Sequence, residues 1–267
     1  MSVPLTIYLE GIGLLGPGLP NWPAGKTVLA GRVPHIEERV VLPEVDALPP
    51  AERRRVGRVV KLALATGSEA ARAAGRDPKR VATVFAASGA DGDCCHEICQ
   101  MLATSDRQIS PTRFHNSVHN VPAGYWSIAT GNTAPSTSLC AFDGSFGAGL
   151  LEAVCQVGSE RSPVLLIAYD TGYPEPLHSA RPIADAFAVA LMLSPERTAS
   201  ALGSIEVELT TDVADVMAEP ALESLRTGYP AARALPLLKT LAHGQARRHV
   251  LDYLDHRRLA VTLASCS

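Results

Sequence analysis

Several stretches of the chain are apolar at nearly every position. Residues 81–87 (VATVFAA) and 163–169 (PVLLIAY) show no regular alternation of polar and apolar side chains. A strand covered on both faces gives such a run, whereas a strand with one face in water alternates. We therefore expect buried strands at both places, and the run at 184–193 (ADAFAVALML) fits a third strand.

Helical spacing dominates residues 53–74, where apolar side chains recur every three or four positions. These are Val56, Val59, Val60, Ala63, Leu64, Ala70 and Ala71. Pro49-Pro50 marks the start of this helix and Gly75 its end. Shorter patterns predict further helices and strands. The helices are expected at 94–104, 122–130 and 147–157, and the strands at 3–9, 136–141 and 205–209.

The segments between these elements are rich in glycine, proline and polar residues. Residues 11–17 are predicted to turn, residues 17–50 to be irregular, and residues 110–120 to form a polar loop. After about residue 212 the spacing predicts helices at 221–225, 235–242 and 247–254, with a short strand at 261–263.

Alternating strands and helices predict an α/β fold with a mostly parallel or mixed sheet flanked by helices. We expect one domain over residues 1–267. Its main part spans residues 1–210, and residues 211–267 form a short helical tail.

Composition narrows the classes of function. The chain is 46% hydrophobic and 19% charged, with a net charge of −3, so no electrostatic feature favours nucleic acid or an anionic membrane surface. No apolar stretch reaches the roughly 18–20 residues that span a bilayer. The N-terminal stretch lacks a basic region and contains Glu10, which makes it a poor secretory signal. We expect a cytoplasmic protein with reduced cysteines and no cofactor.

A cysteine cluster raises the question of a metal site. Cys94, Cys95, His96 and Cys99 fall on one predicted helix, with Cys95 and Cys99 one turn apart. Structural zinc normally takes four ligands from two separated pairs, and no second pair is present. We therefore predict no metal and expect these thiols to be buried as small hydrophobic groups.

The segment from Asn120 to Ala153 resembles the nucleophile segment of the β-ketoacyl synthases of the thiolase superfamily. That family has Asn-x-x-Ala-Gly, then Gly-x-x-Gly-Pro, then Thr-Ala-Cys-x-Ser-Gly. Seven positions fall in register without a gap: Asn120, Ala123, Gly124, Gly131, Pro135, Ser138 and Ala153. Ile109-Ser110-Pro111, Ser88-Gly89 and residues 163–168 also match the family's pattern, so the resemblance covers roughly residues 1–210 and implies the N-terminal half of a thiolase-type fold.

The resemblance places Asp143 where the family has its acyl-accepting cysteine. A carboxylate does not form the thioester that the condensation reaction needs. Cys140, three residues earlier, is an outside candidate for a nucleophile, and its alternative is a packed thiol. The family's two C-terminal histidines have no counterpart, because His243, His249 and His256 lie in the expected helical tail. We therefore expect no catalytic residue, and Asp143 to cap a helix N-terminus instead.

A subunit of this kind resembles the chain-length factors, in particular the short ones of aryl-polyene pathways. The resemblance implies a non-catalytic subunit that pairs with a full-length ketosynthase, shapes its acyl tunnel, and meets an acyl carrier protein. In the family the strand before the nucleophile builds the dimer interface, and a loop that crosses over lines the partner's tunnel. The matching residues are Arg113, Phe114, His115, Asn116, Ser117, Val118 and His119.

Other functions remain open on the sequence alone. A divergent β-ketoacyl synthase or acyltransferase would act through Cys140 or another group, and a homodimer would bind acyl chains without chemistry. Ser145, a histidine and Asp143 match a hydrolase triad in composition only, since the local sequence is not Gly-x-Ser-x-Gly. His115, His119 and Asp143 would give a metal site in principle.

Overall fold

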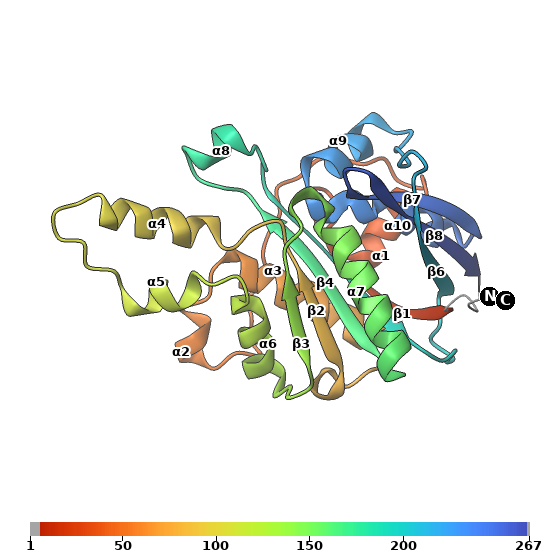
Figure 1. Cartoon of the computed structure of the whole chain (residues 1–267), viewed down its shortest axis with the longest axis horizontal. Helices are drawn as coiled ribbons and strands as arrows, with labels where there is room; N and C mark the ends of the chain where they lie inside the picture. The colour runs from red at the N-terminus through yellow and green to blue at the C-terminus, as the bar shows by residue number, and fades with distance from the viewer. Residues whose placement is uncertain (1–5, 266–267) are drawn as a thin grey trace.

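The apolar runs form the centre of an eight-stranded sheet in this computed structural model, which describes residues 6–265 (Figure 1). The order across the sheet is β3 (Ser136–Leu139), β2 (Ala82–Ala86), β4 (Val164–Thr171), β5 (Ala186–Ser194), β1 (Ile7–Leu15), β6 (Gly203–Thr210), β8 (Arg257–Ser265) and β7 (Arg247–Leu254). The pairs β3–β2 and β2–β4 are parallel and the other pairs are antiparallel. The α/β class is confirmed, with a mixed sheet rather than a mostly parallel one.

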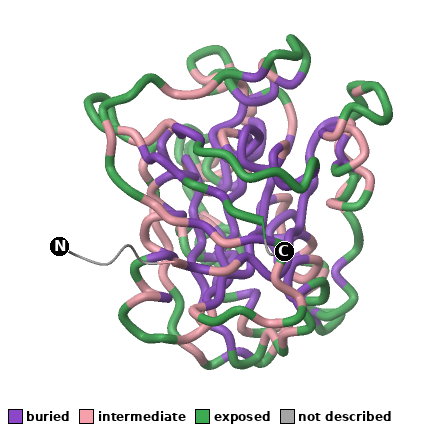
Figure 2. The backbone as a smooth tube through the Cα atoms, turned by 90° about the vertical axis from the view of Figure 1, so that its right-hand side faces the viewer, coloured by how far each residue is buried: buried purple, intermediate pink, exposed green. Residues whose placement is uncertain are grey.

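Helices cover both faces of the sheet. On one face, α3 (Arg58–Ala73) and α6 (Val121–Thr130) pack against β2, β4 and β5. On the other face lie α7 (Ser145–Glu160) and α1 (Trp22–Leu29), together with the helices of the tail. Every residue of β4 and β5 is buried, which explains their unbroken apolar sequences. In Figure 2 the buried segments lie mainly in the middle of the molecule, and most exposed segments lie along its rim.

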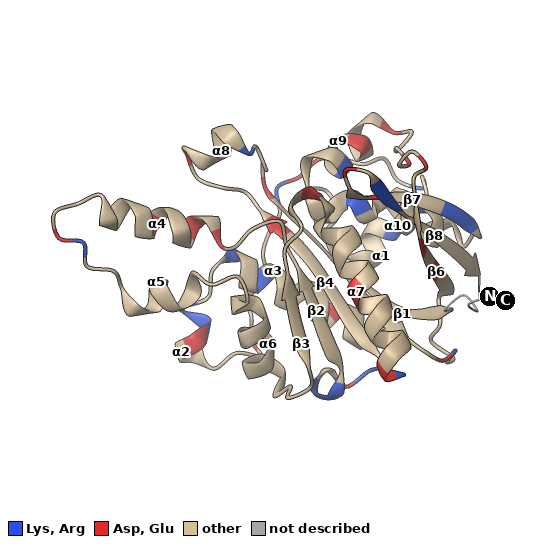
Figure 3. Ribbon diagram, in the orientation of Figure 1, with Lys and Arg blue, Asp and Glu red and all other residues tan. Residues whose placement is uncertain are grey.

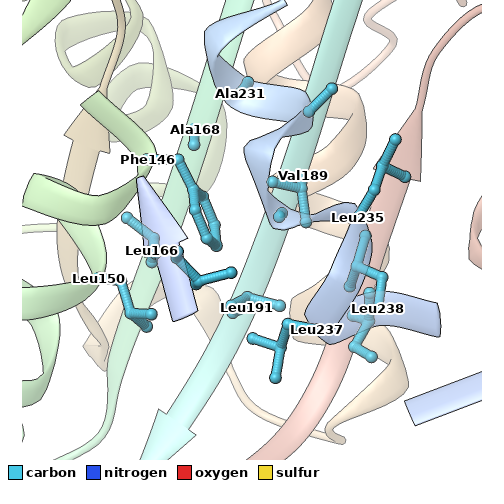
Figure 4. Close-up of a cluster of buried hydrophobic side chains, with 14 of the residues drawn as sticks. Phe146, Leu150, Leu166, Ala168, Val189, Leu191, Ala231, Leu235, Leu237 and Leu238 are labelled. Atoms are coloured by element: carbon cyan, nitrogen blue, oxygen red, sulfur yellow. The ribbon is translucent and has the colours of Figure 1, made fainter. Parts of the chain in front are cut away.

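The tail fulfils its prediction in part. Its helices are α9 (Pro220–Gly228), η3 (Pro230–Ala234) and α10 (Leu235–His243), and they bury apolar side chains against α7, β4 and β5 (Figure 4). The helix predicted at residues 247–254 is wrong, because this segment is strand β7. It pairs with β8, for example His249 with Val261, and that long-range pairing outweighs the local helical spacing.

The N-terminal prediction also needs correction. Strand β1 continues through Gly11 and Gly13, where the sequence predicts a turn, and residues 3–5 of the predicted strand lie outside the described part. A Cβ atom on Gly13 would stand 2.0 Å from the carbonyl oxygen of Thr66. These glycines therefore let the backbone of α3 approach the strand. Helix α1 lies inside the segment expected to be irregular, and the side chain of Asn21 caps it.

Two helices project from the body beyond β3. They are α4 (Gly92–Leu102) and α5 (Pro111–Asn116), and we call residues 92–116 the arm (Figure 1). Helix α5 replaces part of the loop predicted at 110–120. The remaining short elements are α2 (Pro50–Arg53), η1 (Pro78–Arg80) and α8 (Leu177–Ala180). Within residues 6–265, no helix has the length and apolar character needed to cross a membrane.

Candidate functional site

A sharp turn joins the edge strand β3 to the long helix α7. It contains the 3-10 turn η2 (Phe142–Gly144), and Phe142 adopts a φ of 50°, a left-handed conformation that costs energy for a bulky residue. Ser145 stabilises this turn, because its Oγ accepts the N–H of Ala141 (3.0 Å) and donates to the carbonyl of Phe142 (2.7 Å). We call residues 140–145 the elbow. Its geometry places Asp143 directly before the N-terminus of α7.

Asp143 does not cap the helix. The N-cap of α7 is Gly144, and no side chain accepts a bond there. The carboxylate instead accepts a hydrogen bond from Arg181 (2.7 Å) and pairs more loosely with Arg233 (3.6 Å). The guanidinium of Arg181 also stacks over the ring of Phe142, 3.9 Å from its centre. The predicted cap is therefore wrong, because the carboxylate of Asp143 binds two arginines and not the N–H groups at the start of α7.

These ion pairs continue into the tail. Arg233 also pairs with Asp252 (2.8 Å), and the nearly buried Arg226 joins Asp252 (2.7 Å) to Glu223 (2.6 Å). The hydrogen bond from Arg226 lowers the pKa of Glu223 below its ordinary value. Figure 3 shows acidic and basic residues close together beyond the N-terminal end of α7. The elbow is thus tied by charge to α9, η3 and β7.

The backbone of β7 packs directly against the start of α7. A Cβ atom on Gly144 would lie 1.9 Å from the carbonyl oxygen of Tyr253, and one on Gly147 would lie 2.6 Å from that of Asp252. Carbonyl oxygens therefore stand close to the end of the helix where a developing negative charge would need hydrogen-bond donors.

A cleft of about 720 Å³ lies in front of the elbow, between η2 and the β7–β8 turn. Its charged lining consists of Asp143, Asp252, Asp255, Arg233, Arg257, Arg258 and His256. Among residues 6–265, no cysteine lines this cleft, and neither do His115 and His119. The structure therefore does not join Asp143 to the histidines of the considered triad or metal site, and the hydroxyl of Ser145 is already bonded to backbone groups.

Cys140 lies just after β3, outside that cleft. Its thiol donates to the carbonyl of Ser88 at the end of β2 (3.3 Å), and the residue is exposed rather than packed in the core. The neighbouring Asp170, at the end of β4, accepts the N–H (3.0 Å) and the hydroxyl of Ser88 and the N–H of Ala231 (2.8 Å). Complete burial raises the pKa of Asp170 to about 6, although these hydrogen bonds act in the opposite direction.

The segment from Arg113 to His119 divides into anchored and exposed residues. Arg113 pairs with Glu97 (2.9 Å). The buried Asn116 donates to the carbonyl of Arg55 (2.8 Å) and accepts the Tyr125 hydroxyl (3.4 Å). The first contact joins α5 to α4 within the arm, and the Asn116 contacts fix the C-terminal end of α5 against the body.

The other members of this segment face outward or complete the turn. Phe114 is 65% exposed and Val118 is 50% exposed, and His115 is exposed as well. Ser117 donates to the carbonyl of Phe114 (2.8 Å), while His119 is partly buried and its Nε2 has no hydrogen-bond partner among residues 6–265. Apolar side chains are thus available on this surface.

The remaining histidine and cysteine candidates occupy separate places. His249 is buried in β7, where its ring bonds to Asp215 (2.7 Å) and Thr240 (2.6 Å), and burial lowers its pKa. Cys94 is buried as expected, but Cys95 and Cys99 are exposed, which corrects the prediction for these two. Among the described residues, no group of three or more His, Cys, Asp or Glu side chains is arranged to hold a metal ion.

Sequence reasoning missed the cations of the site. Arg181 lies 38 residues and Arg233 90 residues after Asp143, so no local motif connects them. The Asp143 side chain is 45% exposed, so burial gave no signal for compensating cations in the sequence either.

The mixed sheet, with an elbow between its parallel edge strand and a long helix, has the thiolase-like fold of ketosynthases. The family described as β-ketoacyl synthase, N-terminal domain, matches residues 29–251, and the chain belongs to it. This confirms the resemblance seen in the sequence, and the match continues past residue 210. No curated protein matches the sequence.

Solved structures of low identity share the fold. One is a chain of the complex of the ketosynthase ApeO with its chain length factor ApeC from Xenorhabdus doucetiae, with 21% identity and a TM-score of 0.73, covering 97% of this chain and 99% of that one. The ishigamide ketosynthase/chain length factor has 13% identity and a TM-score of 0.72, with coverages of 98% and 100%. The assembly AntDE:AntF, a type II polyketide synthase acyl-carrier protein with its ketosynthase, has 12% identity and a TM-score of 0.74. The match covers 98% of this chain and 100% of that one.

Proposed function

We propose that this protein is a non-catalytic chain-length-factor subunit that pairs with an active β-ketoacyl synthase and shapes its acyl tunnel. The observation that carries the proposal is the elbow. Its tip holds Asp143, whose carboxylate is bound by Arg181 and Arg233 and lies beside the backbone of β7. A ketosynthase needs a thiolate at this point and hydrogen-bond donors around it.

The free edge of the sheet supports the pairing. Strand β3 is the outermost strand at its end, so one side of its backbone has no neighbouring strand among the described residues. Helix α6 contacts β3, and beside α6 the helix α5 and the turn after it expose Phe114 and Val118. An open strand edge beside apolar side chains is a surface that a second subunit can extend and cover.

In this arrangement, residues 113–119 reach the partner's tunnel, and Phe114, His115, Ser117 and Val118 are its wall. Side-chain volume there sets how far an acyl chain can grow. We infer an acyl carrier protein as the donor of the chain, a type II polyketide pathway of the aryl-polyene kind, and the cytoplasm as the location. The ApeO–ApeC complex and the AntDE:AntF assembly, which share the fold, support the ketosynthase and carrier-protein partners.

Reconstitution tests the proposal. The chain is co-expressed with each complete β-ketoacyl synthase of its source organism, and the purified pair is supplied with acyl carrier protein, starter and extender units. We expect one ketosynthase to co-purify in equimolar amount, product to form only with both chains, and Phe114→Ala to lengthen the product. Product formation by this chain alone would contradict the proposal and favour a divergent synthase acting through Cys140.

A further inference from the structure

An apolar groove lies between the turn after α5 and the outer side of α6. It has a volume of about 480 Å³ and its apolar walls are Pro111, Phe114, Val118, Val121, Tyr125 and Ile128. Phe114, Val118 and Ile128 are each about half exposed or more, at 65%, 50% and 49%. Exposing this apolar surface to water costs free energy, and a partner's apolar side chain that covered the surface would remove that cost. We call it the α5–α6 groove.

Gly124 forms an opening in the wall of this groove. It is exposed on α6, one turn before Ile128, and a Cβ atom added to it would meet no atom within 4 Å. Glycine lowers the stability of a helix interior, so local stability does not account for its presence there. The missing side chain leaves space that an atom of another molecule can fill.

The groove adjoins the open edge of the sheet. Helix α6 lies beside β3, the outermost strand, and the arm projects on the same side (Figure 1). A subunit that adds its own strand to β3 therefore brings its neighbouring segment over α6. We infer from this position that the occupant is the ketosynthase partner rather than a free small molecule.

We propose that the α5–α6 groove is a socket for an apolar side chain of the ketosynthase partner, which passes over Gly124. The inference rests on the proposed function and adds the contact that determines affinity. Buried apolar knobs in a pocket commonly contribute most of the binding energy of an interface. The β3 edge alone, four residues long, supplies backbone hydrogen bonds but little apolar burial.

A substitution that fills the socket tests the proposal. Gly124→Leu should keep or raise the melting temperature, because its side chain points into open space on a helix. It should weaken binding of the ketosynthase at least ~tenfold in an equilibrium titration, the loss typical of a disrupted interface pocket. The matched control is Gly228→Leu on α9, where an added Cβ atom also meets nothing within 4 Å. This control should leave the affinity unchanged.

Each result decides between named alternatives. Equal affinity of Gly124→Leu and wild type would overturn the socket while leaving the heterodimer intact. A wild-type chain that binds none of the co-expressed ketosynthases would overturn the proposed function and the socket with it. If sedimentation shows a wild-type homodimer that Gly124→Leu dissociates, the occupant is a second copy and the proposal is wrong. Ile128→Asp, a polar change on the wall formed by α6, should reproduce the loss of affinity if Gly124→Leu fails to fold.

Discussion

The α5–α6 groove comes before strand β3 in the sequence and the elbow comes after it, and the two regions differ in the contacts that surround them. At the elbow, the chain supplies its own partners: arginines hold Asp143, and the β7 carbonyls of Asp252 and Tyr253 press on the start of α7. At the groove, apolar side chains surround open space. A Cβ atom added to Gly124 would contact nothing within 4 Å among the described residues outside its own helix.

The difference indicates where each surface finds its complement. At the elbow, Asp143, Arg181 and Arg233 have their ion-pair partners within the chain, although the Nε atoms of both arginines are buried without a hydrogen-bond partner among the described residues. We therefore expect the elbow contacts to add to folding stability. The groove gains less from folding, since Phe114, Val118 and Ile128 stay about half exposed or more, and these side chains gain further free energy only when another surface covers them. Perturbing the elbow should therefore change stability, while perturbing the groove should change association.

Replacing Gly144 with alanine should have the largest effect. The new Cβ atom would overlap the carbonyl oxygen of Tyr253, which belongs to the backbone of β7 and has no rotamer to change. We expect a loss of about 3 kcal/mol in the free energy of unfolding, measured by urea denaturation. A loss below about 0.5 kcal/mol would mean that β7 does not pack on the elbow in solution.

The pH dependence of stability should show the buried Asp170. Its pKa is about 6 in the fold against 3.8 as the ordinary value, so the folded protein binds this proton more tightly than the unfolded chain. The stability that the fold gains from binding this proton is fully present below pH 3.8 and is lost as the pH rises through 6. The advantage of wild type over Asp170→Asn should therefore shrink by about 2–3 kcal/mol between about pH 4 and pH 7. Parallel stability curves for the two proteins would show that Asp170 does not titrate in this range.

Removing the carboxylate at the elbow should have a moderate effect. Asp143→Ala leaves Arg181 without its hydrogen-bond acceptor, whereas Arg233 keeps Asp252. Because the Asp143 side chain is 45% exposed, we expect a loss of about 1 kcal/mol in stability and no loss of product in the reconstituted pathway. Asp143→Asn serves as a control that keeps the size of the side chain and removes its charge. Loss of product by both variants, with stability intact, would assign chemistry to the carboxylate.

At the groove, a glycine-to-alanine substitution should raise the free energy of unfolding, whereas the same substitution at Gly144 should lower it. Gly124→Ala adds a methyl group in open space on α6 and reduces the freedom of the unfolded chain. We expect a gain of about 0.5–1 kcal/mol in the free energy of unfolding. A loss instead would indicate that Gly124 is already covered, for example by self-association, which sedimentation at several concentrations would detect.

The predictable parts of the fold were those determined by burial on both faces or by long helical spacing. Strands β2 and β4 and helix α3 follow from their apolar patterns for this reason. The helix predicted from residue 53 is interrupted, however, because α2 ends at Arg53 and α3 begins only at Arg58. The helix assigned to residues 247–254 failed because the spacing of Val250, Leu251 and Leu254 fits a helix, while the actual partner is β8. Likewise, Gly11 and Gly13 indicate a turn locally, but they serve the close packing of α3.

The site was predictable only where the chain is contiguous. The register of the motif located Asp143 correctly in the turn before α7. Its contacts with Arg181 and Arg233 depend on how the loop before β5 and the tail fold back over α7, which no local pattern encodes. For the same reason the sequence suggested a helix cap: the nearest available N–H groups are visible in the sequence, whereas distant cations are not.

The intact mass of each subunit after exposure to acyl-loaded carrier protein tests the central claim most directly. The purified heterodimer is incubated with the loaded carrier and quenched in acid, and both chains are weighed. We predict an added acyl group on the ketosynthase and none on this chain. An acyl group on this chain, located by peptide mapping to Cys140 or Asp143, would contradict the account.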